Sequence, residues 1–145
     1  MRLVVDANIL VSELIRVRGR KLIARPELEL YMAEEAWDET IYELNNRIDK
    51  IVSRGVLSQE LGQSLLDDGV ALAEARVVIL PQEIYAPFET IARKRIPRDP
   101  NDWFTVASAL AIEAAIWTSD RDFFGCGIAT WTTDTLLIHW QTDYA

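Results

Sequence analysis

Two residue types that often carry chemistry are almost missing from this chain. It contains one cysteine, Cys126, and one histidine, His139. A single cysteine excludes a disulfide framework within the chain and fits a reducing compartment. One cysteine and one histidine also supply too few ligands for a zinc site or a nucleophile pair. We therefore predict that His139, between Ile138 and Trp140, has a role in the core or at the surface rather than in catalysis.

Long apolar runs and glycine-rich loops are missing as well. No stretch approaches the length that crosses a bilayer, and a strand-like run follows Met1 too closely for a signal peptide. We therefore expect a cytoplasmic protein that makes no membrane contact. Neither GxGxxG nor GxxxxGKS/T occurs, which excludes the usual glycine-rich phosphate sites.

Basic residues are fewer than acidic ones. The chain has 15 Lys and Arg against 23 Asp and Glu, a net charge of −8. This balance argues against broad binding to nucleic acid backbones, but it allows a phosphate substrate at one local site that holds a metal. The basic residues gather at 16–25 and 93–98, and both segments are explained as solvated helix faces. The second segment leads into Asp99 and Asp102, so it is also a candidate for steering a phosphate.

The apolar pattern predicts a single domain over 1–145, long enough to bury a core without disulfide staples. Strand-like runs lie at 2–5, 27–32, 77–80 and 115–118, with an edge strand at 128–130. Helical patterns lie from about 8, and at 34–53, 58–75, 83–94, 99–113 and 133–140. This alternation predicts an α/β sandwich built on a mainly parallel central sheet.

Four acidic residues stand where such a sheet would bring them together. Asp6 ends the first strand, and Asp120 follows the strand at 115–118. Right-handed crossovers place both positions at the same edge of a parallel sheet, where ligands bind. Asp102 lies in the first turn of a helix, and Glu39 lies on the helix at 34–53. Carboxylate oxygens of this kind suit Mg²⁺ or Mn²⁺.

Each acid taken alone also has a structural explanation. Asp6 could cap the helix from about 8, although Asn8 could do the same. Asp102 is favoured by the helix dipole, Asp120 could be a turn residue, and most helical glutamates such as Glu39 face solvent. The convergence of two strand-end acids and a helix-tip acid on one edge is what favours a metal site.

Four segments of the sequence resemble the motifs of PIN-domain ribonucleases. The segment VVDANILVS at 4–12 is similar to the family's opening motif, and RDPND at 98–102, followed by ASAL at 107–110, resembles its central acidic motif. WTSDRDF at 117–123 is similar to the last motif. WDETIYEL at 37–44 stands where the family carries its helical acid. The resemblance spans nearly the whole chain in the correct order.

The resemblance implies a Rossmann-like three-layer sandwich and a Mg²⁺- or Mn²⁺-dependent endoribonuclease. It also implies a VapC-type toxin that forms a homodimer and is inhibited by a small antitoxin protein. We expect single-stranded or looped RNA as the substrate, because its phosphates and bases are exposed. The residues carried over as catalytic and metal-binding are Asp6, Glu39, Asp102 and Asp120, with Asp99 and Asp122 as supporting or substitute ligands. We expect Asn8, Ser12 and Ser119 to orient ligands or water around them.

Ala7 is the one departure, because the family commonly has Thr or Ser there, and a hydroxyl that could support the site is missing. One alternative is therefore a non-catalytic PIN-like domain that binds RNA or protein. Another is a Mg²⁺-dependent phospho-acceptor signalling domain, which usually needs a lysine after a late strand. The lysines here are Lys21, Lys50 and Lys94, and none stands in that place.

Overall fold

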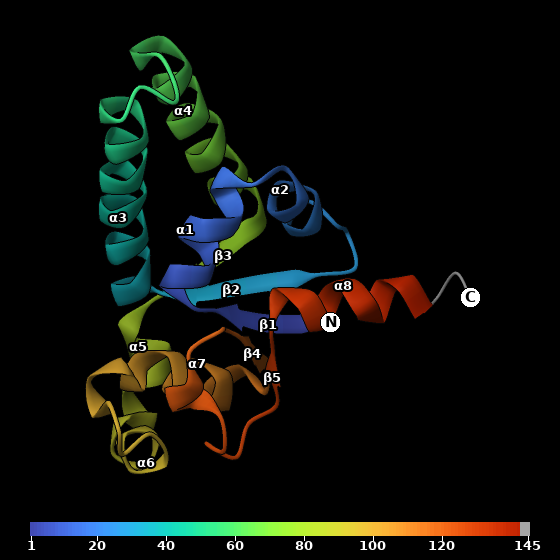
Figure 1. Ribbon diagram of the computed structural model, residues 1–145. Helices are drawn as coiled ribbons and strands as arrows, with labels where there is room; N and C mark the ends of the chain where they lie inside the picture. Colours follow the sequence, from blue (N-terminus) through green and yellow to red (C-terminus); the bar gives the residue numbers. More distant parts are fainter. Residues whose placement is uncertain (143–145) are drawn as a thin grey trace.

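A parallel sheet of five strands runs through the middle of the molecule in the computed structural model, which describes residues 1–142 (Figure 1). The strands are β1 (Arg2–Val5), β2 (Glu29–Ala33), β3 (Val77–Leu80), β4 (Ala115–Trp117) and β5 (Thr130–Trp131). Their order is β3-β2-β1-β4-β5, and every neighbouring pair is parallel. The central strand β1 is flanked on both sides, and its Leu3, Val4 and Val5 are completely buried.

Helices cover both faces of this sheet. One group is α1 (Ala7–Ile15), α2 (Val17–Ile23), α3 (Glu34–Ser53) and α4 (Gln59–Arg76), and the other is α5 (Gln82–Tyr85), α6 (Glu89–Arg95) and α7 (Trp103–Ile112). Figure 1 shows the two groups on opposite sides of the strands, with α8 (Thr133–Thr142) closing the described chain. The predicted three-layer sandwich with a parallel sheet is confirmed. Among residues 1–142, no helix is long and apolar enough to cross a membrane.

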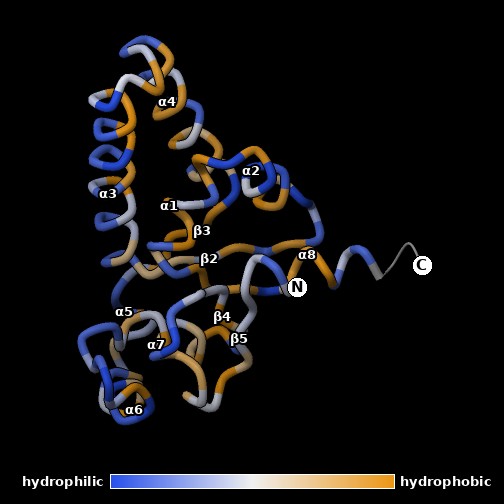
Figure 2. The backbone as a smooth tube through the Cα atoms, in the orientation of Figure 1, coloured by the Kyte–Doolittle hydropathy of each residue, from blue (hydrophilic) through white to orange (hydrophobic). Residues whose placement is uncertain are grey.

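The apolar pattern of the sequence explains which surfaces meet. The strands and the inner faces of the helices are the hydrophobic parts of the backbone trace (Figure 2). In α3 the buried residues are Ala36, Thr40, Leu44 and Ile48, spaced four apart along one face. In α7 the small residues Ala107 and Ala109 are buried, which lets the helix pack closely on β1, β2 and β4.

Local chemistry changes some of the predicted boundaries. The basic segment 16–25 forms a separate helix, α2, because Arg16 has an extended backbone (φ −96°, ψ 141°) that ends α1. The helix predicted at 83–94 is broken into α5, a 3₁₀ turn at Ala86–Phe88 and α6. Pro87 lies in that turn, where its missing N–H would interrupt a continuous helix. A second 3₁₀ turn, Pro100–Asp102, precedes α7, so Asp102 stands at the start of α7.

Candidate functional site

The pairing of β1 with β4 brings the first and last acidic motifs together. Val5 lies opposite Trp117, and the Asp6 amide donates to the Trp117 carbonyl at 3.0 Å, so the ladder continues past the strand ends. One residue further, the Thr118 hydroxyl donates to Oδ2 of Asp6 at 2.9 Å. The same hydroxyl oxygen accepts the Asp120 amide at 3.0 Å. Thr118 is completely buried and thus ties the two strand-end acids to each other.

Asp6 is not a conventional helix cap. It occupies the N-cap position of α1, but its side chain makes no capping hydrogen bond of standard geometry there, and the Asn8 backbone amide has the weakest influence on its pKa. Burial raises the pKa of its carboxyl group from 3.8 to about 6, because the charged form loses water. The hydrogen bond from Thr118 and the Asn8 backbone oppose this rise, whereas the negative charges of Asp120 and Glu39 add to it.

Asp102, at the start of α7, is also partly buried among other acidic side chains. Its carboxyl pKa is raised from 3.8 to about 7, first by burial and then by the charge and hydrogen bond of Asp99. The negative charges of Asp6 and Glu39 raise it further. The raised pKa values of Asp6 and Asp102 thus show that Glu39 lies near both of them and that Asp120 lies near Asp6. The structure brings Asp6, Glu39, Asp102 and Asp120 into one electrostatic cluster, which we call the acidic cluster.

The additional acids have local bonding roles. The Asp99 side chain accepts the Asn101 amide at 3.3 Å and caps the 3₁₀ turn before α7. Oδ1 of Asp120 accepts the Asp122 amide at 2.9 Å and caps the turn Arg121–Phe123. The turn explanation therefore holds for Asp99 and Asp120, and Asp120 combines it with membership of the acidic cluster.

The acidic cluster offers a donor set that suits a hard divalent cation. All its donors are carboxylate oxygens, the ligands that Mg²⁺ and Mn²⁺ prefer. Within the described part of the chain, no three Asp, Glu, His or Cys side chains converge enough to hold a metal ion by themselves. Mg²⁺ usually binds through one or two carboxylates and keeps several waters, so fewer of these acids suffice for it. A cation would also relieve the repulsion that raises the pKa values of Asp6 and Asp102.

Thr118 is the functional candidate that sequence reasoning missed. Its signal was a hydroxyl residue directly after the β4 run and two residues before Asp120. It donates a hydrogen bond to Asp6 from 112 positions away in the sequence, just past the end of β4. Ser12, which we expected to orient ligands, accepts a hydrogen bond from Nη1 of Arg47 at 2.9 Å.

Glu13 is a second residue for which the sequence predicted no role. It lies on the apolar side of α1, next to Leu14, and is only 3% exposed. Its Oε1 accepts the Thr133 hydroxyl at 3.2 Å and forms an ion pair with Arg18 at 3.8 Å. Its Oε2 is buried with no hydrogen-bond partner among residues 1–142. An acid at an apolar helical position was the available signal.

Two of the four basic residues of the segment 93–98 help to hold the fold together. Arg93 bonds to Glu89 at 2.9 Å and to the Pro100 carbonyl at 3.1 Å. Arg95 donates to the Cys126 carbonyl at 3.2 Å. These contacts fix α6 and the turn before α7, which favours the structural explanation for both arginines. His139 packs edge-on against Trp131 and Trp140, as expected for a residue without a catalytic role.

Three solved structures share this arrangement of strands and helices. PAE2754 from Pyrobaculum aerophilum is 18% identical, with a TM-score of 0.64 over 98% of this chain and 90% of that chain. A toxin–antitoxin complex from Klebsiella pneumoniae is 17% identical, with a TM-score of 0.58 over 90% and 97%. FitAcB from Neisseria gonorrhoeae is 18% identical, with a TM-score of 0.56 over 92% and 98%. At such identities the likeness establishes the fold alone.

Sequence comparison gives the family directly. No curated protein matches the chain. The family described as PIN domain matches residues 4–141, which takes in all three acidic motifs and Glu39. Because this match covers almost the entire chain, the protein belongs to the PIN-domain family.

Proposed function

We propose that this protein is a metal-dependent endoribonuclease that hydrolyses RNA phosphodiester bonds at the acidic cluster. The observation that carries the proposal is the crowding of Asp6 and Asp102, whose pKa values are raised by burial and by neighbouring acids. Strongly perturbed acids at the carboxyl ends of parallel strands are typical of functional sites. Membership of the PIN-domain family supports the same reaction, since these domains are generally nucleases.

Each element of the acidic cluster has a place in this proposal. Asp6, Glu39, Asp102 and Asp120 would offer oxygen ligands, of which Mg²⁺ needs only one or two. A bound Mg²⁺ or Mn²⁺ would lower the pKa of water toward neutrality and offset the charge of the scissile phosphate. Thr118 holds Asp6 in one orientation through its 2.9 Å hydrogen bond. Hydrolysis that releases the 3′ oxygen leaves a 5′-phosphate end on the product.

The biological role we propose is that of the toxin in a toxin–antitoxin pair. One of the similar structures is a toxin–antitoxin complex, which supports a small antitoxin protein as the partner. A homodimer follows from the resemblance to VapC-type toxins. A cytoplasmic setting belongs to the same proposal and is supported by the single free cysteine, Cys126.

The test is cleavage of an end-labelled RNA pool of mixed sequence, with Mg²⁺ or Mn²⁺ and with EDTA. Asp102→Asn removes one charge of the acidic cluster and keeps the side-chain shape. Asp68→Asn is the matched control, because Asp68 is exposed on α4 and has no bonding partner within residues 1–142. We expect cutting by the parent and Asp68→Asn with metal, and no cutting by Asp102→Asn or in EDTA.

Cutting by Asp102→Asn at the parent's rate would refute the assignment of the site. No cutting with any metal, together with Mg²⁺ binding measured by calorimetry, would favour the non-catalytic PIN-like binding domain instead. The hydroxyl of Thr118 weakens that alternative, because it donates a hydrogen bond to Asp6 although Ala7 has no hydroxyl.

A further inference from the structure

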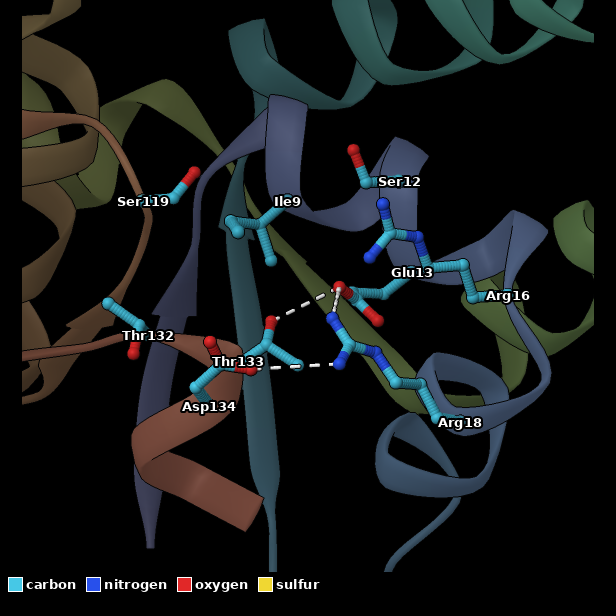
Figure 3. A pocket seen from close by; sticks show the side chains of 9 residues that line it. All are labelled: Ile9, Ser12, Glu13, Arg16, Arg18, Ser119, Thr132, Thr133 and Asp134. Carbon is cyan, nitrogen blue, oxygen red and sulfur yellow. Dashed lines mark hydrogen bonds and ion pairs between the residues drawn. The ribbon is translucent and has the colours of Figure 1, made fainter. Parts of the chain in front are cut away.

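Two adjoining cavities lie along α2, outside the acidic cluster. The first measures about 210 Å³ and is lined by residues that include Ser12, Arg16, Arg18 and Ser119 (Figure 3). Ser119 directly precedes Asp120, so this cavity opens beside the acidic cluster. The second measures about 250 Å³ and lies between α2 and α8. Arg18 lines both, and we call the two cavities together the α2 trough.

The lining of the α2 trough has more basic than acidic side chains, in a protein that is acidic overall: Arg16, Arg18, Lys21 and Arg25 against Glu13 and Asp134. Residues 16–25 contain five basic residues and no acidic one, although the whole chain has a net charge of −8. Three of the five bond to other parts of the protein: Arg18 to Glu13 and Asp134, Arg20 to two carbonyls of α1, and Arg25 to Glu27. Arg16 and Lys21 are exposed and have no such partner among residues 1–142.

These two unpaired cations are divided between the cavities. Arg16 lines the first cavity, and Figure 3 shows its guanidinium group reaching over it toward Ser12. Lys21 lines the second cavity. Between them, Arg18 is held across the trough by its ion pairs with Glu13 at 3.8 Å and Asp134 at 3.6 Å. Arg18 therefore separates the two cavities of the α2 trough, and each cavity has one cation without an ion-pair partner in the described part of the chain, Arg16 in the first and Lys21 in the second.

The second cavity is lined by apolar as well as basic side chains. The apolar ones are Leu22, Leu137 and Trp140, and the guanidinium group of Arg25 lies 4.6 Å from the Trp140 ring centroid. An apolar slot with aromatic and guanidinium surfaces binds a nucleobase, while cations at its rim bind the flanking phosphates. A purely acidic segment such as polyglutamate would use the cations but would leave the apolar slot unfilled.

We propose that the α2 trough binds the single-stranded RNA that continues from the scissile phosphate. Arg16 contacts the nearer phosphate, Lys21 contacts the next one, and the apolar slot takes a base. This inference rests on the proposed function, because its occupant is the substrate of that reaction. It also explains how an acidic protein holds RNA, through unpaired cations on a short path that begins beside the acidic cluster.

The test measures RNA binding separately from cleavage. The protein carries Asp102→Asn to prevent turnover, and fluorescence anisotropy follows a labelled single-stranded RNA of ten nucleotides at several salt concentrations. One variant combines Arg16→Ala with Lys21→Ala. The matched control combines Lys50→Ala with Arg54→Ala, which removes the same charge from two exposed residues at the end of α3.

The expected effect follows from counterion release. Each lost phosphate contact lowers the slope of log K against log salt by about 0.7 for a single strand, so two contacts lower it by about 1.4. At 0.1 M salt this corresponds to roughly 25-fold weaker binding. The control pair should bind within about twofold of its parent, because its charges lie outside the proposed path.

Equal binding by the trough pair and the control pair would overturn the inference. In that case, cutting of RNA with metal by the parent protein, which keeps Asp102, would leave the proposed nuclease intact. Failure of that protein to cut any RNA would instead count against the proposed function itself. Labelled polyglutamate serves as a second probe. If the Arg16→Ala, Lys21→Ala pair loses binding to polyglutamate but keeps binding to RNA, the inference is overturned and the trough is assigned to an acidic protein segment.

Discussion

Replacement of Asp6 by Asn should stabilise the metal-free protein at neutral pH. The carboxyl pKa of Asp6 is about 6 in the folded protein, against 3.8 for the unperturbed group. The charged form is therefore disfavoured in the fold by about two pKa units, or about 3 kcal/mol at 1.36 kcal/mol per unit. Asn has nearly the same shape and can still accept the Thr118 hydroxyl, but it carries no charge.

The sign of the pH dependence follows from the raised pKa. Below the unfolded pKa, Asp6 is protonated in both states and costs nothing. As the pH rises from 3.8 through 6, the unfolded chain releases the proton first, so the parent loses stability, and above this window the loss is complete. The advantage of Asp6→Asn should therefore grow from about 1 kcal/mol near pH 4.5 to about 3 kcal/mol near pH 8.

Urea unfolding followed by tryptophan fluorescence, in EDTA and at several pH values, measures this difference. Asp68→Asn is the control, because it removes the same charge from an exposed position outside the acidic cluster. Addition of Mg²⁺ should stabilise the parent more than Asp6→Asn, since the variant lacks one ligand. The reasoning fails if Asp6→Asn has the parent's free energy of unfolding at pH 8, or if the difference does not change with pH.

Two further predictions concern the hydroxyl group that bonds to Asp6 and the close packing of Gly19 on Glu13, each with a control variant. Thr118→Val should raise the pKa of Asp6 by about one to two units and move the rising limb of the cleavage pH profile upward, as expected for a charged-group hydrogen bond of about 1.5–3 kcal/mol. Thr40→Val, which removes another buried hydroxyl, bonded to a backbone carbonyl, should leave the profile in place. Gly19→Ala should lower the melting temperature, because a Cβ there meets the backbone oxygen and Oε2 of Glu13; about 1–3 kcal/mol is typical of overpacking. Gly69→Ala, whose nearest neighbours would be 3.7 Å away, should not lower it, and an equal loss in both variants would contradict the close packing of Gly19 on Glu13.

Periodicity was enough to predict most of the fold. The continuous apolar runs of β1 and β3 and the four-residue spacing of buried positions in α3 depend on neighbours in the chain, so they are visible in the sequence. The break between α1 and α2 was not visible, because it depends on one extended residue, Arg16, rather than on a change of pattern. The division of the helix at 83–94 could have been read from Pro87.

The identity of the acids was likewise a property of the sequence. Asp6 and Asp120 follow apolar strands, and parallel strands must end at the same edge, so their convergence was predictable from order alone. Their motifs also carried the resemblance to PIN domains, and the family match confirms it. The assignment of Asp6, Glu39, Asp102 and Asp120 as metal ligands stays a prediction.

Only the tertiary structure decided how these acids are supported. The bond from Thr118 to Asp6 joins residues 112 positions apart, and it exists because β1 and β4 pair in one register. The burial of Glu13 and the division of the basic charges of α2 between bonded and unpaired side chains depend on α8 packing beside α1 and α2. A sequence records which side chains are present, whereas burial and charge proximity, which set pKa values and leave cations unpaired, arise only when distant segments share one small volume.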